Sequence, residues 1–279
     1  MKIGLILNDN LDELIKDKKH DGDYDFLDYV SKELGSYKNV KSVDEVHDVD
    51  MAFLLYYPFN SGLCKELLEH EDSLPFINKP SGILKTSEKT FELDNFAEYS
   101  PSTMLLGKYG IDDIVKYADQ FDSLVIKPVD GTGGNGIEFL DKPFHEDDYN
   151  KLEKISQDAP GRYLLQEFVP NDGATRILCY NGEVLGSVKR RSDSDRIHNI
   201  VRGAKVVEYN PTQREIQIAE NVAEKLKSIG VYFIGIDVVN DKLLEVNTAM
   251  PGCLGMINNY ESAYKKVASQ TKEIIKSYS

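Results

Sequence analysis

Residues 235–247 read GIDVVNDKLLEVN, two short apolar strands joined by a tight Asn-Asp turn, which is the pattern of a β-hairpin. Asp237 lies on the first strand, and Glu245 and Asn247 lie two residues apart on the second. Side chains alternate between the two faces of a strand, so Glu245 and Asn247 are expected on the same face. The hairpin therefore predicts a sheet whose polar face carries several oxygen ligands.

Two carboxylates and an amide oxygen on one face would repel one another and would be poorly solvated without a cation. Hard oxygen ligands of this kind suit Mg²⁺, which is usually bound by one or two carboxylates together with the phosphates of a nucleotide. The alternative is an ordinary exposed acidic hairpin. A phosphate-binding segment elsewhere in the chain would favour the metal site.

The composition of the chain limits its class and its partners. With 279 residues, 41% hydrophobic and 29% charged, the chain predicts a soluble globular protein of two or three subdomains. No apolar run reaches the roughly 20 residues that span a bilayer, and a net charge of −14 argues against nucleic-acid or anionic-membrane surfaces. Three widely spaced cysteines without a metal-binding pattern favour a reducing, cytoplasmic location.

A glycine-rich segment supplies the candidate for phosphate binding. The apolar strand 124–128 (LVIKP) leads into VDGTGGNG at residues 129–136, and a further strand follows. Glycines let backbone N–H groups close around phosphate oxygens, because no Cβ blocks the approach. The loop lacks the Gly-Lys-Ser/Thr of a Walker loop. Lys127 adds a cation within a buried strand, although a structural hairpin and a lysine that snorkels to the surface are the alternatives.

The other expected elements complete a mixed α/β pattern. Residues 3–9 and 49–57 predict buried strands, and with a helix over 61–69 and a strand over 75–78 they form a small βαβ-type unit. Asn181-Gly182 predicts a two-residue hairpin turn, and the basic run Lys189-Arg190-Arg191 leaves that hairpin. Residues 213–229 predict an amphipathic helix with Thr212 as its cap.

Five stretches, in order along the chain, carry a family resemblance. They are INKPSGILKTSEKTF (77–91), LVIKPVDGTGGNGI (124–137), RYLLQEFVPNDGATRILCYNGEV (162–184), HNIVRGA (198–204) and FIGIDVVNDKLLEVNTAMPG (233–252). The chain resembles ATP-grasp ligases and is most similar to the prokaryotic glutathione synthetase type. The resemblance implies an α/β (α+β) ATP-grasp fold with a small amino-terminal βαβ pre-ATP-grasp lobe (1–78), a central lobe (79–165) and a carboxy-terminal lobe (166–279).

The resemblance also implies the roles of individual residues, with ATP and Mg²⁺ (or Mn²⁺) as cofactors. Lys89 and Lys127 would hold phosphates, and the loop with Asp130, Gly131, Gly133 and Gly134 would close over the nucleotide. The adenine hinge would be Gln166, Glu167, Phe168 and Val169. The metal ligands would be Asp237, Glu245 and Asn247, and the catalytic residues along the acyl-phosphate site would be Arg176, Arg191 and Asn199.

The implied reaction joins a small-molecule or short-peptide carboxylate to an amine, with ATP activating the carboxylate as an acyl phosphate. Glutathione synthesis from γ-glutamylcysteine and glycine is the leading expectation. A related ligase with another substrate pair and a non-catalytic nucleotide-binding regulator are the alternatives. Residues 56–59 (YYPF) and 250–252 (MPG) depart from the family pattern and motivate the related ligase. Ala174 also departs from it, at a place where the family tends to carry an acidic residue. The sequence also leaves a homo-oligomer open.

Overall fold

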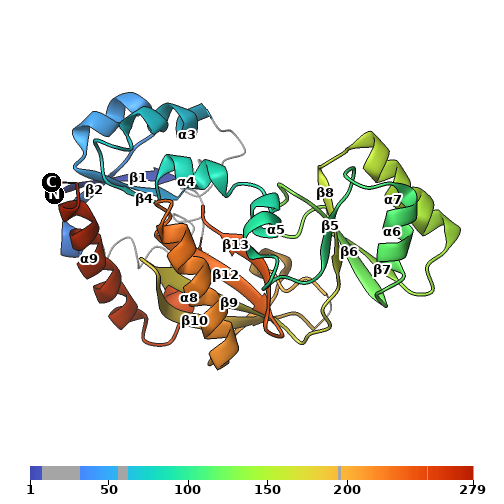
Figure 1. The fold of residues 1–279 in the computed structure, drawn as a ribbon. Helices are drawn as coiled ribbons and strands as arrows, with labels where there is room; N and C mark the ends of the chain where they lie inside the picture. The colour runs from blue at the N-terminus through green and yellow to red at the C-terminus, as the bar shows by residue number, and fades with distance from the viewer. Residues whose placement is uncertain (8–31, 56–61, 194–195, 250, 279) are drawn as a thin grey trace.

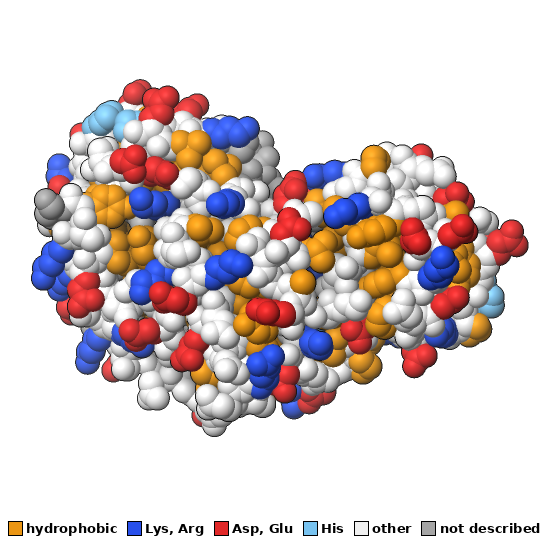
Figure 2. Space-filling view, in the orientation of Figure 1, with side chains coloured by type: hydrophobic (Ala, Val, Ile, Leu, Met, Phe, Trp, Pro, Cys, Tyr) orange, Lys and Arg blue, Asp and Glu red, His pale blue; other side chains and the backbone are white. Residues whose placement is uncertain are grey.

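The computed structural model describes residues 1–7, 32–55, 62–193, 196–249 and 251–278. The strands of these residues form three sheets. Figure 1 shows the amino-terminal sheet beside the carboxy-terminal one, while the central sheet projects away from both, and the two chain ends lie next to each other. Acidic and basic side chains are mixed over the face shown in Figure 2. Within the described parts of the chain, no helix is both long enough and apolar enough to cross a bilayer.

The amino-terminal sheet is parallel and has the order β2-β1-β3-β4. Its strands are β1 (Lys2–Leu7), β2 (Ser36–Asn39), β3 (Met51–Leu55) and β4 (Phe76–Ile77), and its helices are η1 (Val43–Asp48), α3 (Gly62–Glu66), η3 (Leu67–His70) and α4 (Pro80–Lys85). Every residue of β3 is buried, as expected for a parallel strand covered on both faces. The predicted strands of this lobe are confirmed, except that residues 8–9 and 56–57 lie outside the described residues.

The central sheet is antiparallel and has the order β5-β8-β6-β7. Its strands are β5 (Thr103–Leu105), β6 (Ser123–Pro128), β7 (Glu138–Asp141) and β8 (Tyr163–Glu167), and the helices α5 (Thr90–Phe96), α6 (Ile111–Ala118) and α7 (Glu146–Asp158) belong to this part of the chain. Strand β8 continues to Glu167. We propose that the chain divides into three lobes and that the central lobe includes all of β8, so that it ends at Glu167 and not at residue 165.

The carboxy-terminal sheet is antiparallel and has the order β11-β10-β9-β12-β13. Its strands are β9 (Ala174–Tyr180), β10 (Glu183–Arg191), β11 (Lys205–Glu208), β12 (Phe233–Val239) and β13 (Lys242–Asn247), and its helices are η4 (Ile200–Arg202), α8 (Gln213–Lys227), η5 (Leu254–Met256) and α9 (Tyr260–Lys276). Both predicted hairpins are present. Their turn residues Asn181 and Gly182 (φ 52° and 89°) and Asn240 and Asp241 (φ 45° and 61°) adopt the left-handed conformation that two-residue primed turns require.

Helix α8 covers one face of this sheet and leaves the other face for the site. Its predicted cap is confirmed, because the Thr212 hydroxyl accepts a hydrogen bond from the Glu215 N–H at 3.1 Å. The apolar side of α8 packs on Ile177, Ile234 and Ile236, all buried. Each such side chain removed from water contributes about 1.5–3 kcal/mol. This packing fixes which side chains of β9 and β12 face the opposite side.

Asn78, at the end of β4, joins the amino-terminal lobe to the carboxy-terminal sheet. Its Nδ2 donates to the carbonyl oxygens of Phe233 (2.7 Å) and Thr248 (2.8 Å). Its Oδ1 accepts from the N–H groups of Tyr232 (2.6 Å) and Phe233 (2.7 Å). The side chain is fully buried, so all four bonds are shielded from water.

Replacing Asn78 by alanine is expected to lower the free energy of unfolding by about 3 kcal/mol or more, because it leaves four buried backbone groups without partners. Urea unfolding followed by circular dichroism measures the loss. Asn95→Ala is the matched control, since Asn95 donates a single bond to Phe91 within its own helix, and we expect less than about 1 kcal/mol there. Equal losses in the two variants would contradict the joining role of Asn78.

Candidate active site

The uncovered face of the carboxy-terminal sheet gathers charged side chains from four strands. Arg176 on β9 lies opposite Asp237 on β12, and Asp237 lies opposite Glu245 on β13. Asn247 lies opposite Gly235 on the same face, two residues along the strand from Glu245. Directly opposed residues share a face of the sheet. The predicted metal ligands and Arg176 are therefore brought together on one surface.

Two β-bulges set which side chains reach this surface. In the β9–β10 pair the register skips Leu185, so Val188 lies opposite Arg176 and Arg190 lies opposite Ala174. In the β12–β13 pair the register skips Leu244 between Leu243 and Glu245. A bulge inserts one residue and redirects the side chains beyond it. Consequently Arg190, and not Arg191, points to the site, and the consecutive residues Leu244 and Glu245 both line the main pocket.

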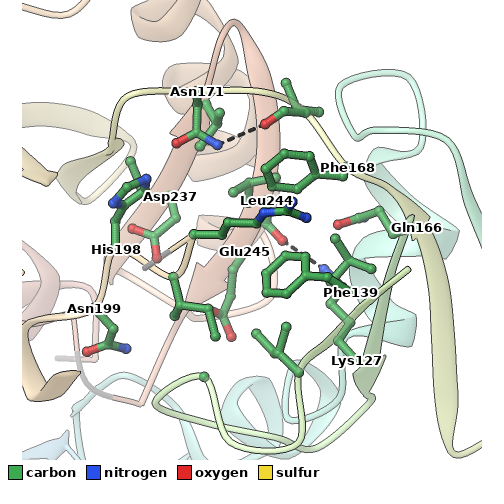
Figure 3. Close-up of a pocket in the computed structure, with 18 of the residues that line it drawn as sticks. Lys127, Phe139, Gln166, Phe168, Asn171, His198, Asn199, Asp237, Leu244 and Glu245 are labelled. Atoms are coloured by element: carbon green, nitrogen blue, oxygen red, sulfur yellow. Dashed lines mark hydrogen bonds between the residues drawn. The ribbon is translucent and has the colours of Figure 1, made fainter. Parts of the chain in front are cut away.

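The main pocket lies between the carboxy-terminal sheet and the central sheet, as Figure 3 shows. Phe139 and Phe168 meet edge to face with their ring centres 5.6 Å apart. The Arg196 guanidinium lies 5.2 Å from each ring centre, and it pairs with Asp141 at 2.9 and 3.0 Å. Aromatic and guanidinium planes of this kind suit a flat heterocycle. The aromatic end of the pocket can thus accept a nucleotide base.

The predicted hinge residues form the wall beside these rings. Gln166, Glu167, Phe168 and Val169 all line the pocket. Gln166 is buried and donates to the Thr103 hydroxyl at 2.8 Å, while the Glu167 carboxylate accepts from the Ser102 N–H at 3.2 Å. These bonds orient the two side chains. The next two residues, Phe168 and Val169, follow β8 and also line the pocket.

Both predicted lysines line the pocket, and Figure 3 shows Lys127 near Leu244 and Glu245. Lys127 is buried, and its ammonium donates to the Leu244 carbonyl at 3.3 Å. Burial lowers the pKa of Lys127. The Lys89 ammonium lies 2.8 Å from a Glu245 oxygen and 2.6 Å from the Gly131 carbonyl. Burial alone would lower the pKa of Lys89, but the charges of Glu245 and Glu92 outweigh it and raise that pKa.

Asp237 is held by two arginines in a buried ion-pair network. Its Oδ1 accepts from Arg176 Nε and from Arg190 Nη2, both at 2.6 Å, and its Oδ2 accepts from Arg176 Nη2 at 3.0 Å. Burial alone would raise the pKa of Asp237, but the two guanidinium charges outweigh it and lower the pKa to about 2. Asp237 therefore stays ionised at neutral pH, and Arg176 acts on the pocket through Asp237, because it does not itself line the cavity.

The glycine-rich loop joins this site to the helix that carries Lys89. Gly134 lines the main pocket with φ 79°, and a side chain there would lie 2.8 Å from Ile197. Asp130 and Gly131 line a second, smaller pocket shared with Lys89, Glu245 and Asn247. The Asp130 carboxylate also pairs with Arg162. Gly133 has φ 65° and shapes the turn without lining either pocket.

Arg191 is the predicted residue that the structure places elsewhere. Its guanidinium pairs with Asp172 on the surface, and the side chain is 47% exposed. Arg190, the neighbour that does face the pocket, is buried, and its Nε has no hydrogen-bond partner among the described residues. Asn199 lines the pocket as expected, next to His198 (Figure 3). The reason for the correction is the bulge at Leu185, which shifts β10 by one residue.

Four further residues of the site were not predicted from the sequence: Glu92, Phe139, His198 and Arg196. Phe139 could have been found, because it is the aromatic residue of the strand that follows the glycine-rich loop. Glu92 resembled an ordinary surface charge of a helix, yet it is buried in the structure. His198 and Arg196 come from a segment without regular secondary structure. No local pattern places that segment over the pocket.

The oxygen atoms of Asp237, Glu245 and Asn247 are chemically suited to bind a hard divalent cation. Asp237 and Glu245 lie opposite one another, and the hydrogen bonds of Asn247 use its Nδ2, at 3.3 Å from the Gly235 carbonyl and 3.4 Å from Asp237. The carbonyl oxygen of that amide is thus left for another partner. Among the described residues no three His, Cys, Asp or Glu side chains form a metal-binding group. Two carboxylates completed by an amide oxygen and by phosphates suit Mg²⁺ or Mn²⁺.

Comparison with known proteins agrees with this fold. The family model of the prokaryotic glutathione synthetase ATP-grasp domain matches residues 88–262. The chain is 33% identical over 192 residues to the glutathione synthetase of Thermosynechococcus vestitus, covering 67% of this chain and 58% of that protein. It is 31% identical over 229 residues to that of Prochlorococcus marinus subsp. pastoris, covering 78% and 73%. The chain thus spans little more than half the length of the first of these relatives.

Solved structures give the same fold at low identity. The crystal structure of a D-cycloserine synthetase matches with a TM-score of 0.71 at 12% identity, covering 96% of this chain and 99% of the other. The D-alanine–D-alanine ligase of Bacillus anthracis matches with a TM-score of 0.66 at 15% identity, covering 100% and 97%. The fold is that of the ATP-grasp proteins. With the family match, this chain belongs to the prokaryotic glutathione synthetase ATP-grasp family, as the sequence resemblance predicted.

Proposed function

We propose that this protein is an ATP-dependent, ADP-forming ligase that joins a carboxylate to an amine. The observation that carries the proposal is the pocket between the central and carboxy-terminal sheets, which is lined by two aromatic rings, by two lysines and by two carboxylates, with Lys89 paired to Glu245. This arrangement suits a nucleotide whose base lies on Phe139 and Phe168 and whose phosphates reach Lys89 and Lys127. The match to glutathione synthetases supports γ-glutamylcysteine and glycine as the specific substrates.

Asp237, Glu245 and Asn247 would hold the divalent cation. When bound, Mg²⁺ or Mn²⁺ neutralises phosphate charge and polarises the oxygens of the transferring phosphoryl group. In the structure Lys89 neutralises Glu245, and Arg176 and Arg190 neutralise Asp237. Ligand binding would therefore exchange these internal partners for phosphate and metal.

The protein's own residues supply positioning and charge. A carboxylate is a poor electrophile at neutral pH, so we propose that its oxygen takes the γ-phosphoryl group of ATP and that the amine then displaces phosphate from the acyl phosphate. Such transfer requires alignment and charge stabilisation more than a covalent nucleophile. Lys89 and Lys127 would hold the phosphates, Arg190 would donate to the transferring group, and Asn199 and His198 would close the side of the pocket.

The deciding experiment is release of ADP and phosphate from Mg-ATP with γ-glutamylcysteine and glycine, with mass detection of the product. We expect a product at the mass of glutathione, and ADP release that requires both acceptors. ADP release only with other acid–amine pairs would keep the ligase class and reject these substrates. ATP binding without turnover on any pair would reject the enzyme in favour of a nucleotide-binding regulator.

A related ligase with another substrate pair is the second candidate, and specific residues favour it. Ala174 lines the main pocket at a position where the family tends to carry an acidic residue. The other two departures fall on residues 56–59 and on Met250, outside the described residues. We propose a cytoplasmic location and small carboxylate and amine partners for either candidate, with a homo-oligomer left to measurement.

A further inference from the structure

Strand β13, which carries Glu245 and Asn247, is the edge of the five-stranded sheet. The outward backbone groups of an edge strand have no neighbouring strand to pair with. In this protein other groups satisfy them. The Leu243 N–H donates to the Tyr99 carbonyl at 2.9 Å, the Leu244 carbonyl accepts from Lys127, and the Val246 N–H donates to a Glu92 oxygen at 2.7 Å.

Thr248, the residue that follows β13, is held in the same way. The Thr248 carbonyl accepts from Asn78, and the Thr248 hydroxyl lies 2.8 Å from that of Thr86. Residues 244, 246 and 248 are thus bonded by Lys127 and by the segment 78–92. The proposed metal ligands Glu245 and Asn247 alternate with these residues along the chain and line the pockets together with them.

Glu92 is the unexpected member of this set. Its carboxylate is buried on α5, where an apolar residue would cost less to bury. Lys89 is the N-cap residue of α5 and lies three residues before Glu92, so the first turn of this helix connects the Glu92 hydrogen bond to the proposed phosphate-binding lysine. We infer that Glu92 is a positioning residue, whose hydrogen bond to the Val246 N–H fixes Glu245 and Asn247 relative to Lys89 and Lys127. This inference rests on the proposed function for the role of those four residues.

The hydrogen bond, and not the charge, is the feature that positions the strand. Burial raises the pKa of Glu92 to about 7. The positive charges of Lys127 and Lys89 lower this pKa, and the negative charge of Glu245 raises it further. The Val246 N–H requires only an acceptor oxygen at this place, so a neutral side chain with such an oxygen can make the same hydrogen bond. Glutamine keeps the reach and the acceptor oxygen, aspartate keeps the charge but is one methylene shorter, and alanine keeps neither.

The test compares Glu92→Gln, Glu92→Asp and Glu92→Ala in the full chain. Electron paramagnetic resonance measures Mn²⁺ affinity in the presence of AMP-PNP, a non-hydrolysable ATP analogue. Hydrogen exchange measures the Val246 amide without ligands. We expect the Mn²⁺ Kd of the glutamine variant within about twofold of wild type, and that of the aspartate and alanine variants raised roughly tenfold. The Val246 amide should exchange about tenfold faster in the latter two only.

Two controls separate positioning from general stability. Asp94→Asn changes an exposed carboxylate on the same helix, and Val222→Ala loosens the core beneath the sheet. Both should leave Mn²⁺ affinity unchanged, even where Val222→Ala lowers the melting temperature as far as Glu92→Ala does. A Val222→Ala protein that loses Mn²⁺ affinity equally, or an aspartate variant that keeps affinity while the glutamine variant loses it, would overturn the inference.

If the proposed function is wrong, the same experiments give a result that differs from the one expected when only the positioning role of Glu92 is wrong. A wild-type protein that binds no Mn²⁺ with AMP-PNP would reject the metal site itself. The exchange of the Val246 amide, measured without metal, would still decide whether Glu92 holds the strand. Unchanged exchange in all three variants would overturn the positioning role whatever the activity of the protein.

Discussion

Replacing Glu245 by glutamine is expected to abolish measurable ADP formation, a loss of about a thousandfold or more, while the fold stays intact. Losing one preorganised group that stabilises developing charge costs roughly a hundredfold to a thousandfold in other enzymes. Glu245 acts in three ways at once, because it lines both pockets, lies opposite Asp237 and pairs with Lys89. The glutamine removes the charge that a divalent cation and Lys89 both require.

The measurement is coupled ADP release under saturating Mg-ATP and both acceptors, with circular dichroism to verify the fold. Glu224→Gln is the control, because Glu224 is an exposed glutamate of α8, remote from both pockets. It should keep wild-type turnover. Near-normal turnover in Glu245→Gln would mean that the metal assignment is wrong, and the ligand set would have to be sought elsewhere.

Local chemistry was enough to predict the parts of the fold that depend on neighbours in the chain. The hairpin at 235–247 and the Asn181-Gly182 turn are present, because turn residues with positive φ and alternating apolar strands specify them directly. Strand alternation also placed Glu245 and Asn247 on one face. The capped helix α8 follows from Thr212 and an apolar stripe.

The site depended on features that no short window of sequence contains. An unbulged hairpin around Asn181-Gly182 would place Arg191 on the face of Arg176, whereas the bulge at Leu185 places Arg190 there. Glu92 becomes a buried hydrogen-bond acceptor only when β13, 154 residues further along, docks on α5. Tertiary packing of this kind decides the role of a polar residue after its helix has formed.

The two neighbouring arginines of β10 give a matched test of this register. Arg190→Met is expected to lower kcat/KM about a hundredfold, because Arg190 is buried, lines the pocket and bonds Asp237 at 2.6 Å. Its buried Nε, which has no hydrogen-bond partner within the described residues, is free to donate to a bound anion. Arg191→Met should stay within about threefold of wild type, since its exposed pairing with Asp172 contributes little.

The comparison is informative because the two substitutions are the same and differ by one position in the chain. Arg176 still pairs with Asp237 in the Arg190→Met protein, so the buried carboxylate keeps a counter-charge and the fold should survive. Steady-state kinetics and urea midpoints for both variants separate lost function from lost stability. Should Arg191→Met lose a hundredfold while Arg190→Met stays active, β10 would lack the bulge at Leu185, and the register of the whole polar face would have to be shifted by one residue.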